Sequence, residues 1–152
     1  MQKITPFIWF DDNVQEAADF YLSVFKNGTV SGSMPGPGGK TMSVTLFLEG
    51  QELILFDGGP IFKLNEAFSL SVSCATQEEI DYYCGKLTGS GGQESRCGWL
   101  KDKYGLSWQI ITPRLITMLT DKDPEKANRT MQAMLKMNKL DIAGLQKAYN
   151  GE

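Results

Sequence analysis

The chain of 152 residues contains no histidine at all. Histidine is the side chain whose unperturbed pKa lies closest to neutral pH, and it is also a common metal ligand. Its absence excludes imidazole both as a general base and as a ligand. There are only three cysteines, without Cys-x-x-Cys spacing, which indicates free thiols in a reducing cytoplasm rather than a disulfide framework.

The sequence also lacks a dense basic run and a long apolar segment. Its formal net charge of −3 at pH 7 argues against a nucleic-acid partner, because phosphate binding requires a basic surface. No segment approaches the roughly 20 apolar residues of a membrane-spanning helix, and the first residues lack the pattern of a signal peptide. We therefore expect no nucleic-acid partner, no membrane association and a cytoplasmic location.

The first part of the chain predicts a strand, a helix and a hairpin. Residues 4–10 are rich in β-formers, and Asp11-Asp12-Asn13 is a helix-start cluster. Apolar residues then recur at helical spacing: Val14, Ala17, Ala18, Tyr21, Val24 and Phe25. Residues 31–39, rich in Gly, Pro and Ser, predict a mobile loop. Residues 42–48 and 52–56 predict a β-hairpin around Gly50-Gln51.

The same order of elements begins again after residue 59. Residues 69–74 alternate between serines and apolar residues, as in a half-buried strand. Thr76 and Glu79 have the spacing of a capping box and predict a helix that ends near Ser90. Residues 93–100 and 106–112 predict the closing strands. A shift of about sixty residues superposes the two halves, which indicates two related βαβββ modules.

The last part of the chain predicts a helical extension. Asp123-Pro124-Glu125 is a strong helix start, and Asp141 can cap a further short helix. The apolar stripe between them predicts packing or a dimer contact, with a ligand groove or a docking surface for a partner as the alternatives; its members are Ala127, Met131, Met134, Leu135 and Leu140. The expected boundaries are 1–59 and 60–113 for the modules and 114–152 for the extension, within one structural domain.

Three segments carry distinctive motifs, namely residues 4–10, residues 58–67 and residues 97–109. They resemble the PhnB-like family, whose domain bears the name 3-demethylubiquinone-9 3-methyltransferase. That family belongs to the vicinal-oxygen-chelate superfamily of glyoxalases, ring-cleaving dioxygenases and antibiotic-resistance proteins. The resemblance implies an α+β fold of paired βαβββ modules that form a cupped mixed sheet, and a homodimer. It leaves open whether the modules pair within one chain or across the dimer.

The resemblance also locates four metal-ligand positions of the metal-using relatives. They fall on Thr5, Ile54, Ala67 and Gln109 of this chain. One amide and one hydroxyl make a poor donor set, because divalent transition metals prefer imidazole, thiolate or carboxylate. We therefore expect no metal and no other cofactor.

Period-two alternation assigns one set of side chains to the open face of the predicted sheets. The candidate ligand-binding residues are Thr5, Phe7, Trp9, Phe47, Ile54, Phe56, Ser69 and Gln109. They predict an aromatic and apolar cavity with few hydrogen-bonding groups, which is typical of small-molecule pockets. The alternative is that these rings fill a closed core.

No catalytic group can be assigned from the residues. Glu52, Asp57 and Glu66 lie near strand ends or in loops, so we expect them at the rim as solvated or hydrogen-bonded carboxylates. Cys97 has no histidine to activate it as a nucleophile. The prediction is a metal-independent homodimer that binds a small apolar or aromatic molecule. The alternative is an enzyme acting on a quinone-like or aromatic molecule, either a methyltransferase, as the family name suggests, or a lyase or dioxygenase.

Overall fold

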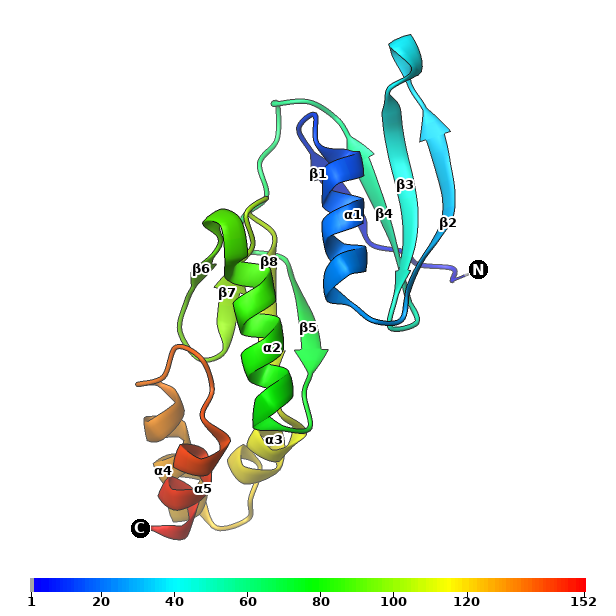
Figure 1. The fold of residues 1–152 in the computed structure, drawn as a ribbon. Helices are drawn as coiled ribbons and strands as arrows, with labels where there is room; N and C mark the ends of the chain where they lie inside the picture. Colours follow the sequence, from blue (N-terminus) through cyan, green and yellow to red (C-terminus); the bar gives the residue numbers. More distant parts are fainter. Residues whose placement is uncertain (1) are drawn as a thin grey trace. The chain divides into compact units, whose positions relative to one another are not determined.

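The structure is a computed structural model that describes residues 2–152, and it divides into two compact units at Leu64 and Asn65 (Figure 1). Each unit contains a four-stranded mixed sheet and the order strand, helix, three strands. In both sheets the first strand of the unit lies at one edge and pairs in parallel with the last strand. The predicted α+β fold with two βαβββ modules and C-terminal helices is confirmed.

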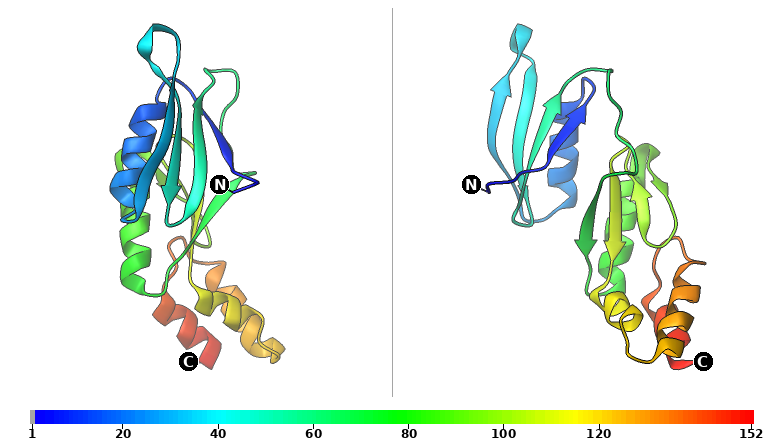
Figure 2. Two further views of the ribbon diagram at one scale, coloured as in Figure 1. Left: turned by 90° about the vertical axis from the view of Figure 1, so that its right-hand side faces the viewer. Right: turned by 180° about the vertical axis from the view of Figure 1, so that it is seen from behind.

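The first unit has the strand order β1-β4-β3-β2. Its elements are β1 (Phe7–Phe10), α1 (Val14–Val24), β2 (Gly28–Pro35), the short helix η1 (Pro37–Gly39), β3 (Thr41–Leu48) and β4 (Gln51–Asp57). Helix α1 covers one face of this sheet, and the view from behind shows the other face uncovered by any helix of the unit (Figure 2). The core lies between helix and sheet, where Ala17, Tyr21, Leu46 and Leu55 are fully buried.

The expectation of a mobile loop over residues 31–39 is wrong for most of its length. Residues 28–35 form β2, which pairs antiparallel with β3. Since β2 is an edge strand whose side chains are almost all exposed, it needs no alternation of apolar and polar residues. Its Gly, Ser and Pro content therefore resembled that of a loop.

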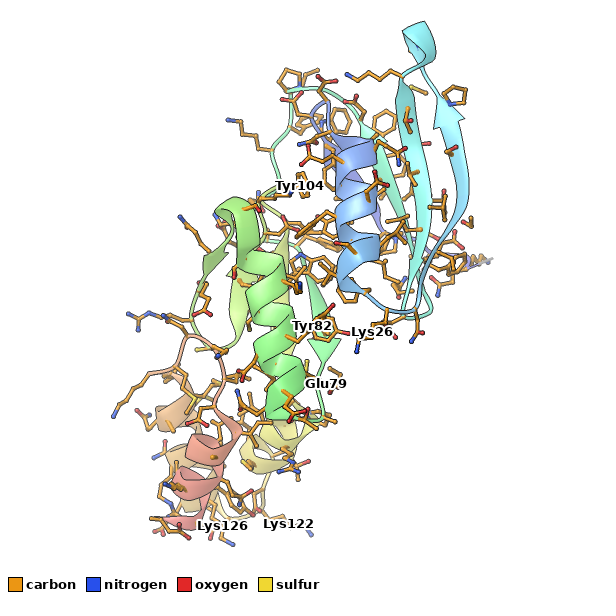
Figure 3. All side chains as sticks on the ribbon, viewed as in Figure 1. Lys26, Glu79, Tyr82, Tyr104, Lys122 and Lys126 are labelled. Atoms are coloured by element: carbon orange, nitrogen blue, oxygen red, sulfur yellow. The ribbon has the colours of Figure 1, made fainter. Side chains whose placement is uncertain are left out.

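The second unit repeats the arrangement with the order β5-β8-β7-β6. Its elements are β5 (Ser69–Ser73), α2 (Gln77–Thr88), the short helix η2 (Gly89–Gly91), β6 (Gln93–Glu94), β7 (Trp99–Lys101) and β8 (Ser107–Ile111). The predicted capping box is confirmed: Thr76 Oγ1 accepts the Glu79 N–H at 3.2 Å. The Glu79 carboxylate in turn accepts the Ala75 N–H at 2.6 Å at the first turn of α2 (Figure 3).

The predicted strand over residues 93–100 is interrupted. Cys97 and Gly98 both adopt positive φ, at 60° and 84°, between β6 and β7. Their N–H groups donate to the carbonyls of Met137 and Asn138, at 2.8 and 2.7 Å. A side chain at position 98 would stand 2.8 Å from the Ile110 carbonyl oxygen, so this break requires glycine.

The C-terminal extension consists of α3 (Pro113–Leu119), α4 (Pro124–Met134) and α5 (Ile142–Asn150). The helix starts predicted at Asp123 and Asp141 are confirmed, whereas α3 was not expected. Gln77 of α2 holds the extension, since its side chain donates to the Leu140 carbonyl and accepts the Ile142 N–H. Among residues 2–152, no helix combines the length and the apolar character needed to cross a membrane.

Candidate functional site

The open face of the first sheet carries the alternate residues of β1 and β4. In β1, Ile8 and Phe10 are 3% exposed beneath α1, whereas Phe7 on the other face is 59% exposed. Parallel register places Phe7 beside Ile54 and Trp9 beside Phe56. The predicted side-chain alternation is thus present, and it aligns four of the candidate ligand-binding residues on one surface.

Aromatic side chains form a cluster on this surface. The ring of Phe56 lies 5.2 Å from that of Phe7 and 5.5 Å from that of Trp9, and Phe62 meets Trp9 at 5.0 Å. Phe7 and Phe62 keep large exposed fractions, 59% and 63%. Within the first unit, these rings do not form a closed core.

The indole of Trp9 is fixed by the segment that follows β4. Its Nε1–H donates to the Gly59 carbonyl at 2.8 Å. Its ring lies flat against Gly58, where a Cβ atom would come within 2.1 Å of the indole carbons. The Gly58-Gly59 pair that helped identify the family resemblance therefore positions an aromatic ring of the candidate site.

A groove of about 550 Å³ lies on the same face. Its lining includes Gln2 and Thr5 from the N-terminal segment, Thr45 and Phe47 of β3, and Glu52 and Ile54 of β4. The structure thus brings three predicted residues, Thr5, Phe47 and Ile54, into one groove. The other three of this unit, Phe7, Trp9 and Phe56, make the aromatic cluster.

Glu52 corrects one prediction. We expected it at the rim as a solvated or hydrogen-bonded surface carboxylate, but the residue is only 8% exposed and lines the groove. Thr5 Oγ1 donates to its Oε1 at 3.4 Å. Period-two alternation along the strand places Glu52 on the same face as Ile54 and Phe56, and the groove lining agrees with this assignment. Phe62 was missed because it lies outside any periodic segment.

The second unit carries the remaining two candidates. Gln109 Nε2 donates to Ser69 Oγ at 2.9 Å, which brings both side chains together on the open face of that sheet. A cavity of about 240 Å³ lies on the same unit, lined by Trp99, Lys101, Ser107 and Glu66 among others. The Lys101 ammonium pairs with Glu66 at 2.5 Å, and this hydrogen bond lowers the pKa of the Glu66 carboxyl.

The residues at the four implied metal-ligand positions do not suit a divalent transition metal. In the first unit they supply the Thr5 hydroxyl and the hydrocarbon of Ile54, with Glu52 as a single nearby carboxylate. In the second unit the Gln109 amide already donates to Ser69. Among residues 2–152 no group of three or more Cys, Asp or Glu side chains could hold an ion. We therefore derive no metal-dependent step.

The cysteines are not arranged as nucleophiles. Cys74 and Cys84 are buried, and desolvation raises the pKa of their thiols to about 12 and about 11. A thiol with such a raised pKa is almost fully protonated at neutral pH, and the thiolate is the reactive form. Cys97 is half-buried and unpaired.

Comparisons with known proteins agree with this architecture. A family model described as 3-demethylubiquinone-9 3-methyltransferase matches residues 2–111. Among solved structures, the chain is 33% identical to a PhnB protein from Bacillus cereus that carries the same methyltransferase description. The alignment covers 73% of this chain and 99% of that one, with a TM-score of 0.67. Among curated proteins none matches the chain significantly.

More distant structures share the fold alone. A protein from Pseudomonas aeruginosa is 19% identical, with 74% of this chain and 98% of that one covered and a TM-score of 0.60. The fosfomycin resistance protein FosX from Listeria monocytogenes, in complex with Mn(II) and sulfate, is 14% identical at a TM-score of 0.52, with 71% and 90% covered. The chain belongs to the 3-demethylubiquinone-9 3-methyltransferase (PhnB-like) family.

Proposed function

We propose that this protein binds a small aromatic or largely apolar molecule on the open face of its first sheet, without a metal and as a homodimer. The observation that carries the proposal is the aromatic cluster of Phe7, Trp9, Phe56 and Phe62. Two of its rings, Phe7 and Phe62, are more than half exposed, and a groove of about 550 Å³ lies on the same sheet next to the cluster at Ile54, which pairs with Phe7. Exposed aromatic surface next to a concavity is typical of ligand or partner sites.

A thermal-shift screen with aromatic and quinone-like compounds, in the presence of a metal chelator, tests the proposal. We expect at least one compound to raise the melting temperature. The Phe7→Ala variant should weaken that effect because it removes an exposed ring that contacts Phe56. Phe68→Ala, which removes a 47% exposed ring from the second unit, is the matched control. Binding that requires added metal, or that survives both substitutions equally, would contradict the proposal.

Homodimerisation is the assembly that we propose. It is supported by the family resemblance and by the large apolar side chains that stay exposed in each unit, among them Phe7, Phe62, Phe68 and Leu135. Light scattering after size-exclusion chromatography should give twice the protomer mass at micromolar concentration. A concentration-independent monomer would contradict this part of the proposal.

We further propose a cytoplasmic location. The three free cysteines support a reducing compartment such as the cytoplasm.

The second candidate is an enzyme acting on a quinone-like or aromatic molecule, and the family description supports it. A methyl donor such as S-adenosylmethionine is commonly held at a Gly-rich loop between a parallel strand and a helix. Here the helices that follow the parallel strands β1 and β5 have Asn13 and Thr76 as their N-cap residues, and the segments before these residues contain no glycine. Calorimetric titration with S-adenosylmethionine distinguishes the candidates: micromolar binding would favour the methyltransferase.

A further inference from the structure

We infer that the ligand of the first-sheet groove is amphiphilic, with a hydrogen-bond donor, best a primary amine, against Glu52 and an apolar body along Ile54 and Phe56. The inference rests on the proposed function and names the class of molecule that the groove takes. It follows from the state of the Glu52 carboxylate and from the side chains that continue along the same strand.

The Glu52 carboxylate has one protein donor and can accept more. The residue is 8% exposed, and a single hydrogen bond reaches its side chain within residues 2–152, from Thr5 at 3.4 Å. That length lies beyond the usual range for an O–H donor, so the bond is weak. An ionised carboxylate can accept several hydrogen bonds. Because Glu52 lines the groove, a ligand can supply a further donor in place of water.

The open face of the first sheet is apolar from Glu52 along β4 towards Phe56. Along β4, Ile54 and Phe56 follow on the same face, at about 7 Å and about 13 Å by the rise of a strand. On β3, Phe47 stands opposite Glu52. On β1, Trp9 lies beside Phe56. Along β4, the open face of the sheet therefore changes from a carboxylate at Glu52 to an aromatic ring at Phe56. The distance between them is similar to the length of a phenylalkyl chain.

The charge of the unit favours a cation over an anion. Acidic residues outnumber basic ones among residues 1–64, where the only basic residues are Lys3, Lys26, Lys40 and Lys63. A negative surface raises the local concentration of cations and repels carboxylates. A purely hydrocarbon ligand would cover Glu52 without giving it a donor, which carries a desolvation cost. A protonated amine avoids both the repulsion that a carboxylate meets and the desolvation cost that a hydrocarbon imposes on Glu52.

Three probes of equal length test the inference on the full-length protein: 3-phenylpropylamine, 3-phenylpropan-1-ol and 3-phenylpropionate. Calorimetry or NMR titration should show the amine binding about tenfold or more tightly than the carboxylate, with the alcohol between them. The Glu52→Gln variant should lose about tenfold in amine affinity and change alcohol affinity little, because it keeps the shape and removes the charge.

Asp19→Asn is the matched control, since it removes one negative charge from the exposed surface of α1 and should leave all three affinities unchanged. Circular dichroism checks that both variants fold. If Glu52→Gln is unfolded, Thr5→Val keeps the carboxylate, removes its protein donor and should strengthen amine binding. Equal affinity for amine and carboxylate in the wild type would overturn the inference while leaving the proposed function intact. No binding by any probe, together with a negative aromatic screen, would overturn both.

Discussion

The carboxylate of Asp102 accepts the indole N–H of Trp108 at 2.9 Å, across the turn that joins β7 to β8. Its other oxygen accepts the N–H groups of Tyr104 and Leu106, at 2.9 and 3.1 Å. Asp102 is 3% exposed and Trp108 is 2% exposed. The charged turn that contributed to the family resemblance is thus held together by one buried carboxylate.

Replacing Asp102 by alanine should destabilise the protein by about 3 kcal/mol, because it leaves three buried or half-buried N–H donors without their acceptor. Urea unfolding followed by circular dichroism measures the change. Glu94→Ala, which removes an exposed carboxylate from neighbouring β6, is the control and should change stability by less than about 0.5 kcal/mol. A near-neutral Asp102→Ala would show that the turn does not depend on this carboxylate.

Gly58→Ala should displace the indole of Trp9, because the added methyl group would overlap its ring. We expect the Trp9 indole N–H signal in a nitrogen-correlated NMR spectrum to shift or broaden, since its bond to Gly59 is lost, and ligand binding to weaken. The control is Gly85→Ala in α2, where no atom lies within 4 Å of the new methyl group. An unchanged Trp9 signal in Gly58→Ala would contradict the packing described here.

Only one of the three thiols should react under native conditions. Cys74 and Cys84 are buried and therefore inaccessible to a reagent. Burial also raises the pKa of Cys74 to about 12 and that of Cys84 to about 11, so both thiols stay protonated. Labelling with a disulfide reagent should modify Cys97 alone, and all three thiols should react after unfolding in urea. Cys97→Ser should abolish the native reaction. Fast native labelling of a second thiol would show that the second unit opens locally.

The bond from Tyr149 to Asp121 should make the extension sensitive to pH. The Tyr149 hydroxyl donates to Asp121 at 2.6 Å, which lowers the pKa of the carboxyl and raises that of the phenol. A carboxyl with a lowered pKa contributes stability above its unfolded value, and this contribution disappears as pH falls through the folded value. The phenol's contribution is present below its own unfolded pKa and disappears as pH rises through the raised value.

The stability difference between the wild type and Tyr149→Phe should therefore be largest near neutral pH and decrease on both sides. Urea midpoints at about pH 3, 7 and 11 measure it, around the usual values of Asp and Tyr. The substitution keeps the ring that faces Lys126 at 5.3 Å. A difference that does not vary with pH would indicate that packing alone accounts for the contribution of Tyr149.

The sequence predicted correctly the elements whose conformation depends on residues nearby in the chain. It did not predict features whose conformation depends on contacts with residues far away in the chain. The stripe of α1 and the Thr76 cap depend on neighbours along the chain, and both are confirmed. The break at Cys97 and Gly98 depends on carbonyls of Met137 and Asn138, which local patterns cannot indicate. The face of Glu52 was predicted correctly, but its exposure was not, because nearness to a strand end was taken as exposure, whereas the groove that it lines includes Gln2 and Thr5 from the other end of the unit.

Both sheets are completed by pairing the first strand of the unit with its last, Phe7 with Ile54 and Ser69 with Ser107. Neither β1 nor β5 can therefore find its partner on the ribosome until most of its unit has emerged from the exit tunnel. Such long-range pairings slow folding and leave apolar strands uncovered in the meantime. The first unit nevertheless contains all of its own strands, so it can complete its sheet while the second is still being translated.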